Sequence, residues 1–219
     1  MRPHIVWDWN GTLLHDIDAV MVATNASFAE LGLDPITLER YRELYVVPVP
    51  KFYERLMGRL PTDAEWVVMD EAFHRHYWVA AEEAGLADGA RELLRDWQAD
   101  GLTQSLLSLA PHDKLVPLVR GYGIDGHFLR VDGRTGPSHT SKAGHLVRHM
   151  AALEASGVTA ARTVLVGDAV DDATAAQHVG ARAVLYTGGS HSRASLQTAG
   201  VPVVDSLAEA VALARELAG

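Results

Sequence analysis

Carboxylate, amide, hydroxyl and ammonium side chains lie where four apolar segments of this sequence give way to polar ones. These groups are Asp8, Asn10, Ser108, Lys142, Asp168, Asp171 and Asp172. The segment HIVWDW predicts a buried strand that ends at Asp8, after which NGT turns the chain. In an open parallel sheet, ligands bind beyond the carboxyl ends of the strands. If the later strands run parallel to the first, one edge of the sheet therefore collects all of these groups.

Such a collection of side chains would bind a hard cation together with a phosphate. Clustered carboxylates repel one another and are costly to bury unless a cation joins them. A ligand set made of oxygen atoms, without His or Cys, favours Mg²⁺. Lys142 would neutralise a phosphoryl oxygen, while Ser108 and the backbone N–H groups after it, beginning with Leu109, would hold the others. A carboxylate placed against that phosphate, such as Asp8, can attack phosphorus and form an aspartyl-phosphate.

Alternating strands and helices must position these groups. After Gly89 the two kinds of segment alternate as far as the final helix, SLAEAVALARELA, which predicts a parallel sheet covered on both faces. Residues 16–86 instead show helical patterns and no convincing strand. The sequence therefore predicts an α/β protein with a Rossmann-like parallel sheet core, residues 1–15 and 87–219. A helical cap, residues 16–86, is inserted after the first strand.

Composition excludes several classes of protein. The formal net charge of −9 opposes nucleic-acid binding, which needs a basic surface. The chain has no cysteine, which excludes disulfides, thiolate zinc sites and a cysteine nucleophile. We find no signal peptide and no apolar run near the roughly 20 residues of a membrane span. We therefore expect a soluble cytoplasmic protein with no membrane association and no evident need for a protein partner.

The four segments resemble the motifs of the haloacid dehalogenase superfamily. DWNGTL is similar to the first motif, D-x-D-G-T-L or V, and Ser108 in SLLS to the second. Lys142 in TSKAGH is similar to the third motif, and GDAVDD matches the fourth, G-D-x-x-x-D. The motifs follow the family's order, and the helical region lies where that family inserts its cap. The resemblance covers nearly the whole chain and is nearest to the phosphoglycolate-phosphatase-like group.

This resemblance implies a nucleophile and a metal site. Asp8 corresponds to the family's nucleophile, and Asp168 would bind Mg²⁺ together with Asp8 and the backbone carbonyl of Asn10. Asp172 would be the second acidic partner, either as a direct ligand or through water. Asp171 is expected to point elsewhere.

The resemblance also implies groups that hold the substrate. Ser108, Leu109 and Lys142 would bind the phosphoryl group, with Lys142 also serving catalysis, and Thr12 would support the turn beside it. The implied activity is that of a Mg²⁺-dependent phosphatase acting on a small phosphorylated metabolite. The cap is expected to set specificity. Three of its side chains either reach the mouth of the pocket or form a solvated helix face, namely Lys51, Tyr53 and Arg55.

Asn10 is where the chain departs from the family pattern. In family members with a carboxylate at this position, that group protonates the leaving group and then activates water. An amide donates hydrogen bonds but cannot exchange a proton near neutral pH, and general acid–base catalysis contributes roughly 10²–10⁴-fold. Three interpretations remain open. The leaving group needs little protonation, as in acyl or phenolic phosphates; or another group, such as His15, supplies the proton; or the phosphoryl group passes to an acceptor other than water.

These interpretations leave rival functions. A phosphotransferase would use the same aspartyl-phosphate, and a phosphate-binding or regulatory protein would have kept the site while losing turnover. A dehalogenase would leave the acidic fourth motif unexplained. His145 and His149 have the spacing of a zinc pair but no evident third ligand. TGGS, residues 187–190, lacks the lysine of a P-loop and is predicted to be a flexible loop.

Overall fold

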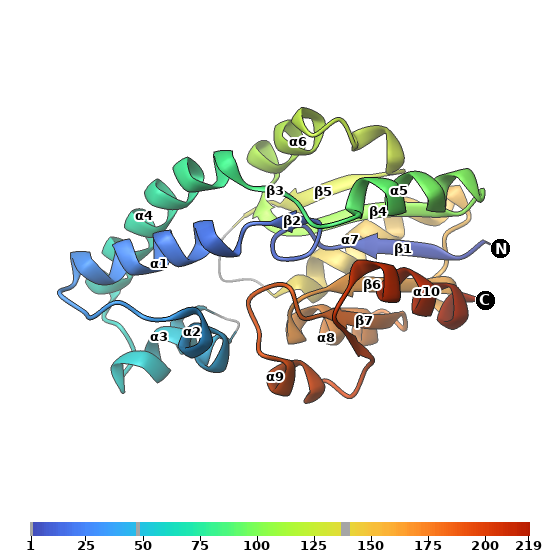
Figure 1. Cartoon of the computed structure of the whole chain (residues 1–219). Helices are drawn as coiled ribbons and strands as arrows, with labels where there is room; N and C mark the ends of the chain where they lie inside the picture. Colours follow the sequence, from blue (N-terminus) through green and yellow to red (C-terminus); the bar gives the residue numbers. More distant parts are fainter. Residues whose placement is uncertain (1, 47–48, 137–140) are drawn as a thin grey trace.

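Parallel strands build the central sheet of this computed structural model, which describes residues 2–46, 49–136 and 141–219 (Figure 1). Six strands of the described chain form it, in the spatial order β5 (Val131–Arg134), β4 (Thr103–Pro111), β1 (His4–Trp7), β6 (Thr163–Gly167), β7 (Arg182–Tyr186) and β8 (Val203–Val204). Every neighbouring pair in this order is parallel. β1 is central, so its carboxyl end lies between those of β4 and β6.

The sequence of β1 explains its central place. All four residues, His4–Trp7, are fully buried, as expected for a strand of a parallel sheet that is covered on both faces. Trp7 pairs with Leu106 on β4 and with Val166 on β6. The backbone N–H of Asp8 donates to the carbonyl of Val166 at 2.9 Å, which continues the ladder by one residue. Asp8 is thereby fixed at the edge where a ligand would bind.

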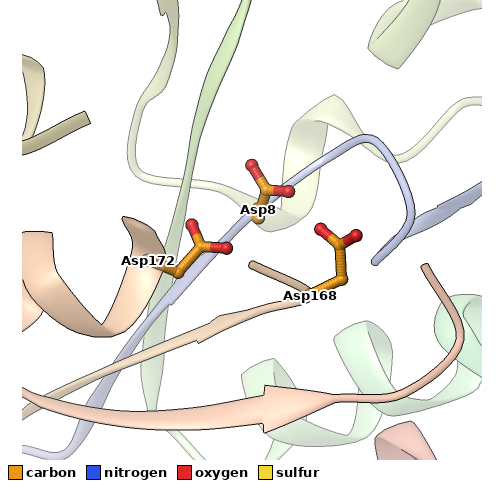
Figure 2. A group of neighbouring side chains, drawn as sticks. All are labelled: Asp8, Asp168 and Asp172. Carbon is orange, nitrogen blue, oxygen red and sulfur yellow. The ribbon is translucent and has the colours of Figure 1, made fainter. Parts of the chain in front are cut away.

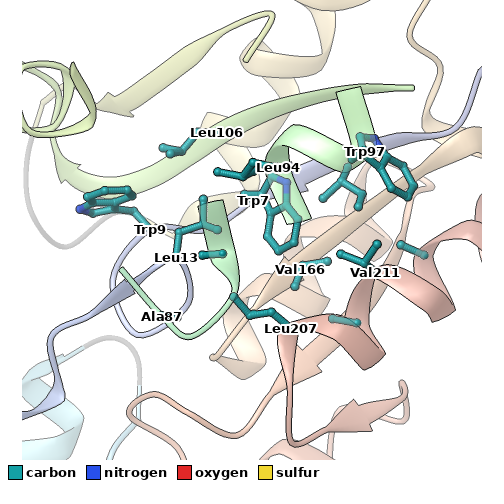
Figure 3. Close-up of a cluster of buried hydrophobic side chains, with 14 of the residues drawn as sticks. Trp7, Trp9, Leu13, Ala87, Leu94, Trp97, Leu106, Val166, Leu207 and Val211 are labelled. Atoms are coloured by element: carbon teal, nitrogen blue, oxygen red, sulfur yellow. The ribbon is translucent and has the colours of Figure 1, made fainter. Parts of the chain in front are cut away.

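Helices cover both faces of the sheet, as predicted. One face packs against α5 (Ala90–Ala99), α6 (His112–Gly121) and α10 (Leu207–Ala218), through Trp7, Leu94 and Trp97 among others (Figure 3). The other face packs against α7 (Lys142–Leu153), α8 (Val170–His178) and α9 (Arg193–Gln197). Burial of these apolar surfaces is the dominant favourable contribution to the stability of such a layered core.

The cap is a helical insertion after β1, again as predicted. It contains α1 (Ile17–Glu30), α2 (Leu38–Leu44), α3 (Val49–Met57) and α4 (Asp63–Ala80), followed by a short 3₁₀ turn, Ala81–Glu83. These helices share an apolar cluster separate from those of the sheet, centred on Phe28, Phe52 and Met69. α1 and α4 run alongside one another (Figure 1). The assignment of domain boundaries at residues 15/16 and 86/87 stays a prediction.

A small antiparallel ladder joins the cap to the core, and the sequence did not predict it. β2 (Leu14–His15) pairs with β3 (Gly85–Leu86), so that Leu14 faces Leu86 and His15 faces Gly85. The expectation of no strand between residues 16 and 86 is therefore wrong at its last residues. Two-residue strands are too short to show a periodic pattern, and these form only because the chain leaves and returns to the core at the same place.

Two core strands also differ from their predicted bounds. β4 continues beyond SLLSL to Pro111, with an irregular register between Leu107 and Pro111, so Ser108 is not its last residue. β5 begins at Val131, where the expected segment HFLRV ends, because residues 125–127 form a 3₁₀ turn. No helix in the part of the chain that the structure describes combines the length and apolar character needed to cross a membrane.

Candidate active site

Three buried carboxylates meet at the carboxyl edge of the sheet. Asp8 follows β1, Asp168 follows β6, and Asp172 lies in the first turn of α8. One carboxylate oxygen from each lies within 4.8 Å of the others (Figure 2). The structure thus brings together the three acidic residues that the sequence placed in the metal site. Strand adjacency explains this meeting, because β1 and β6 are direct neighbours.

Lys142 joins this cluster from the first residue of α7. Its Nζ donates to Oδ1 of Asp8 and, at 2.5 Å, to Oδ1 of Asp172, and its side chain is only 4% exposed. The backbone N–H of Lys142 donates to Oδ2 of Asp171 at 2.9 Å. Asp171 therefore accepts the first N–H of α7 and is not one of the three clustered carboxylates. The expectation that it points away from the site stays a prediction. TSKAGH begins at Thr140, which lies outside the described residues.

The electrostatics of the cluster favour a bound cation. Burial raises the pKa of Asp8 to about 7; the ammonium of Lys142 opposes this shift and the carboxylate of Asp172 adds to it. Burial also raises the pKa of Asp168, and the charges of Asp8 and Asp172 raise it further. Burial alone would lower the pKa of Lys142, but the two carboxylates that it contacts outweigh this effect and raise it. Three carboxylates facing one ammonium, all buried, fit a hard divalent cation such as Mg²⁺.

Asn10 is held by two residues that sequence reasoning did not assign to the site. Its Nδ2 donates to Oδ2 of Asp16 at 2.8 Å and to the hydroxyl of Tyr77 at 2.6 Å. The Tyr77 hydroxyl in turn donates to the same Asp16 oxygen at 2.6 Å, and the N–H of Gly11 donates to the other at 2.7 Å. A carboxylate in place of Asn10 would face Asp16 directly, so the amide complements this buried acid.

The hydroxyl of Ser108 lies beside this group. Ser108 is 1% exposed; its Oγ donates to Oδ1 of Asn10 at 3.4 Å and accepts the N–H of Ala110 at 3.0 Å. Leu109 lines the same pocket, as expected for a backbone that would face a phosphate. Thr12 is fully buried under the turn and does not line the described part of the pocket, so its role in binding substrate stays a prediction.

The TGGS segment belongs to the site, although the sequence indicated only a flexible loop. The N–H of Ser190 donates to Oδ2 of Asp168 at 2.7 Å. A Cβ at Gly189 would lie 1.9 Å from that oxygen, so only glycine allows the loop to approach Asp168 this closely. From the cap, Arg42 donates to the carbonyls of Gly189 at 2.9 Å and Gly188 at 3.2 Å. The loop is thus anchored from both sides.

Comparison with known proteins decides the family. Residues 3–180 match the haloacid dehalogenase-like hydrolases. This chain belongs to that family. The match confirms the family resemblance and makes the protein an enzyme of the hydrolase class.

Distant relatives of this haloacid dehalogenase-like hydrolase are phosphatases. A phosphoglycolate phosphatase from Cereibacter sphaeroides is 28% identical over 194 residues, covering 85% of this chain and 86% of that protein. A 5'-nucleotidase from Pseudomonas aeruginosa is 24% identical over 178 residues, covering 81% and 79%. These relatives bear out the expected phosphoglycolate-phosphatase-like group.

Solved structures show the same fold. A candidate phosphoglycolate phosphatase from Lactobacillus delbrueckii subsp. bulgaricus superposes with a TM-score of 0.82 at 19% identity, over 98% of this chain and 99% of that one. A hydrolase from Pseudomonas syringae has a TM-score of 0.78 at 19% identity and covers 100% of both chains. The sheet with its helical insertion is therefore that of the haloacid dehalogenase-like hydrolases.

A cavity of about 300 Å³ lies between the cap and the core of this hydrolase. Asp8, Lys142 and Asp168 belong to its core side. Aromatic residues from α2–α4 and their flanks dominate its cap side, among them Tyr41, Tyr45, Phe52, Trp66, Tyr77 and Trp78. Of the three cap residues singled out from the sequence, Tyr53 is buried and lines the cavity, whereas Lys51 and Arg55 are exposed and do not.

His15, His145 and His149 do not line the cavity. His15 is exposed on β2 and does not line it, so the structure gives it no access to a leaving group. His149 is buried and contacts Oδ2 of Asp132 and Oγ of Ser105, each at 2.8 Å. His145 contacts Arg148 at 2.8 Å. Among the described residues, the group of side chains that could hold a metal is acidic and includes neither histidine.

Proposed function

We propose that this protein is a Mg²⁺-dependent phosphatase that hydrolyses a small phosphorylated metabolite through an aspartyl-phosphate on Asp8. The observation that carries the proposal is the placement of Asp8. Its carboxylate contacts Lys142 and lies beside Asp168 and Asp172, at one end of a cavity that the cap closes. Relatives named as a phosphoglycolate phosphatase and a 5'-nucleotidase support the same class of reaction.

The residues of the cluster have separate roles in binding the metal and the phosphoryl group. Asp8, Asp168, Asp172 and the backbone carbonyl of Asn10 would hold Mg²⁺, which supplies positive charge against the phosphoryl oxygens. Lys142 neutralises a further phosphoryl oxygen, since its ammonium is fixed by two carboxylates. Because Lys142 neutralises part of the negative charge of the cluster, the anionic substrate enters a less repulsive site.

The reaction proceeds in two steps, formation of the aspartyl-phosphate and its hydrolysis. An oxygen of Asp8 forms a bond to phosphorus while the bond to the leaving oxygen breaks, and the electron pair of that bond leaves with the oxygen. Water then attacks phosphorus, which releases phosphate and restores the Asp8 carboxylate. Ser108 and the N–H groups around Leu109, which line the cavity, would hold the phosphoryl oxygens through both steps.

Asn10 limits proton transfer in both steps. Its amide is fixed by Asp16 and Tyr77 and cannot supply a proton to the leaving oxygen. Turnover then depends on leaving groups that depart as anions. This feature also favours a second candidate, a phosphate-binding protein with little turnover, and leaves room for transfer of the phosphoryl group to another acceptor.

Release of p-nitrophenol from p-nitrophenyl phosphate with Mg²⁺ tests the proposal. This phenolate leaves without protonation, so Asn10 does not mask a working nucleophile. We expect steady release that disappears in Asp8→Asn and persists in Asp113→Asn, which removes an exposed carboxylate on α6. A single burst equal to the enzyme concentration would indicate a long-lived intermediate and a phosphotransferase. No release, combined with stabilisation by Mg²⁺ and inorganic phosphate, would indicate the binding protein.

A further inference from the structure

The two sides of the active-site cavity differ in charge. Among the described lining residues, the lysine and arginine side chains are Lys142 and Arg134, and both come from the core. The cap side contributes aromatic rings together with Asp70 and His74 on α4, and Asp16 lies at the boundary between cap and core. Among the described residues, the cap side of the cavity therefore offers a substrate no lysine or arginine.

The side chains of Lys142 and Arg134 already have partners within the core. Lys142 contacts Asp8 and Asp172, which places it at the phosphoryl position. The Nε of Arg134 donates to the carbonyl of Leu109 at 3.0 Å, and its Nη1 donates to the carbonyl of Gly136. These bonds engage Arg134 with backbone carbonyls of the core, although its side chain also lines the cavity.

The aromatic wall opposes an anionic leaving group. The faces of aromatic rings carry partial negative charge, and they attract neutral apolar groups and cations. A carboxylate placed against Trp66 and Tyr53 would lose its water without gaining a partner of opposite charge, and Asp70 nearby would repel it. Phosphoglycolate, the substrate in the name of several relatives, carries such a carboxylate.

A second observation concerns the bond that breaks. Asn10 supplies no proton, so an alkoxide would leave poorly while a phenolate leaves with the electron pair of its bond to phosphorus. The structure therefore restricts the leaving group in two independent ways. The cavity selects for an uncharged aromatic body, and Asn10 selects for an oxygen of low basicity.

From these observations we propose that the enzyme is selective for aryl phosphates whose leaving group carries no carboxylate. This inference rests on the proposed phosphatase function. Asp8 forms its bond to phosphorus as the bond between phosphorus and the aryl oxygen breaks. The phenolate takes a proton from solvent, and water cleaves the aspartyl-phosphate to release phosphate.

Matched substrates test the two selections separately. We expect kcat/KM for phenyl phosphate to exceed that for 4-carboxyphenyl phosphate at least tenfold, although the carboxylate makes its phenolate the better leaving group. Benzyl phosphate keeps the ring but leaves as an alkoxide, and we expect kcat at least tenfold lower than for phenyl phosphate. Phosphoglycolate fails on both grounds and is expected to be the poorest of the four.

A positive charge introduced among the aromatic residues of the cap tests whether they cause the selection against a carboxylate. Trp66→Arg places a cation in the cavity and should reverse the preference, so that 4-carboxyphenyl phosphate becomes the better aryl substrate. Val67→Arg is the matched control, because Val67 is 51% exposed on the same helix and does not line the cavity. It should leave the preference unchanged.

Several results would overturn the inference. The inference fails if 4-carboxyphenyl phosphate or phosphoglycolate is hydrolysed as well as phenyl phosphate, or better. If Arg134→Gln then abolished the preference for the carboxylate-bearing substrate, Arg134 would be identified as the partner of that carboxylate. If no ester is hydrolysed, the proposed function fails while the cavity can still be tested. Calorimetry with Mg²⁺ would then compare phenylphosphonate with its 4-carboxy derivative, and equal or tighter binding of the derivative would refute the selection against charge.

Discussion

At the scale of single residues, the amide of Asn10 is paired with a buried acid, Asp16. The haloacid dehalogenase superfamily motif places a carboxylate where Asn10 stands, and here the buried carboxylate is Asp16, six residues later. Asp16 accepts hydrogen bonds from Asn10, Gly11 and Tyr77. With both oxygens occupied, Asp16 orients Asn10 and is not placed as a free base.

The hydrogen bond between Asn10 and Asp16 predicts how substitutions at these two positions will behave. Asn10→Asp alone sets two carboxylates against each other and removes a donor to Asp16, so it should lower the free energy of unfolding by about 1–3 kcal/mol. Adding Asp16→Asn restores a donor–acceptor pair and should recover most of that loss. Urea unfolding of the wild type, the two single variants and the double variant measures this coupling; additive losses would show that the two residues act independently.

The same double variant tests catalysis. A carboxylate at position 10, supported by an amide at position 16, can protonate a leaving alkoxide. We expect kcat for benzyl phosphate to rise within the roughly 10²–10⁴-fold range of general acid–base catalysis, and kcat for p-nitrophenyl phosphate to change much less. Equal changes for the two substrates would exclude proton transfer as the step that Asn10 limits.

At the scale of elements, a buried polar chain crosses from β1 to α7. His4 contacts Oγ1 of Thr103 at 2.9 Å and Oγ of Ser105 at 2.8 Å, and His149 on α7 contacts the same Ser105 oxygen. Asp132 on β5 closes the chain at the other nitrogen of His149. These bonds satisfy polar groups within an apolar sheet and tie three strands to one helix.

This series of buried hydrogen bonds makes the free energy of unfolding depend on pH. Burial, with a smaller contribution from the nearby His149, lowers the pKa of His4 to about 3. The folded protein therefore keeps His4 neutral, while the unfolded chain binds a proton below about pH 6.5. The contribution of His4 to the free energy of unfolding is fully present above pH 6.5. It is lost as the pH falls towards 3, by roughly 1.4 kcal/mol per pH unit.

Urea unfolding at two pH values checks the effect. Between pH 6.5 and 5, the wild type should lose about 2 kcal/mol more than His4→Gln. His178→Gln removes an exposed histidine and should keep the wild-type dependence, because His4 remains. Identical pH dependence of the wild type and His4→Gln would show that His4 is not held neutral.

At the scale of the whole molecule, the cap contacts the core through the loop that touches Asp168. Arg42 on α2 donates to the carbonyls of Gly188 and Gly189, and its own carbonyl accepts the N–H of Ser192 at 3.1 Å. The ring of Tyr45 packs edge-on against His191, with centroids 5.0 Å apart. The cap therefore supports the loop that contacts Asp168 and closes the cavity.

Loss of Arg42 should loosen this closure. We expect Arg42→Gln to raise KM several-fold for aryl phosphates, because hydrogen bonds from a charged group contribute roughly 1.5–3 kcal/mol. The affinity for Mg²⁺, measured as the rise in melting temperature with metal concentration, should fall as well. Arg40→Gln is the control, since Arg40 pairs at 3.0 Å with Glu43 and both side chains are exposed. An equal effect in both variants would point to α2 rather than to the loop contact.

Much of the core was predictable because its determinants are local. The apolar run before Asp8 indicates a buried strand, and the alternation after Gly89 indicates a covered parallel sheet. Parallel strands end at the same edge, so Asp8 and Asp168 had to approach each other once β1 and β6 were neighbours. The roles of these residues in catalysis stay proposals that the experiments above test.

Local patterns in the amino-acid sequence were enough to specify the order of elements, the insertion of helices after β1 and the edge at which the acidic residues gather. The surroundings of these residues depend on the folded arrangement of cap and core. Tyr77 reaches Asn10 across 67 positions of sequence, Gly189 packs on Asp168, and the aromatic rings of the cap line one cavity. Apolar and turn patterns act between near neighbours in the chain, whereas these contacts depend on how the cap docks on the core, which no local pattern specifies.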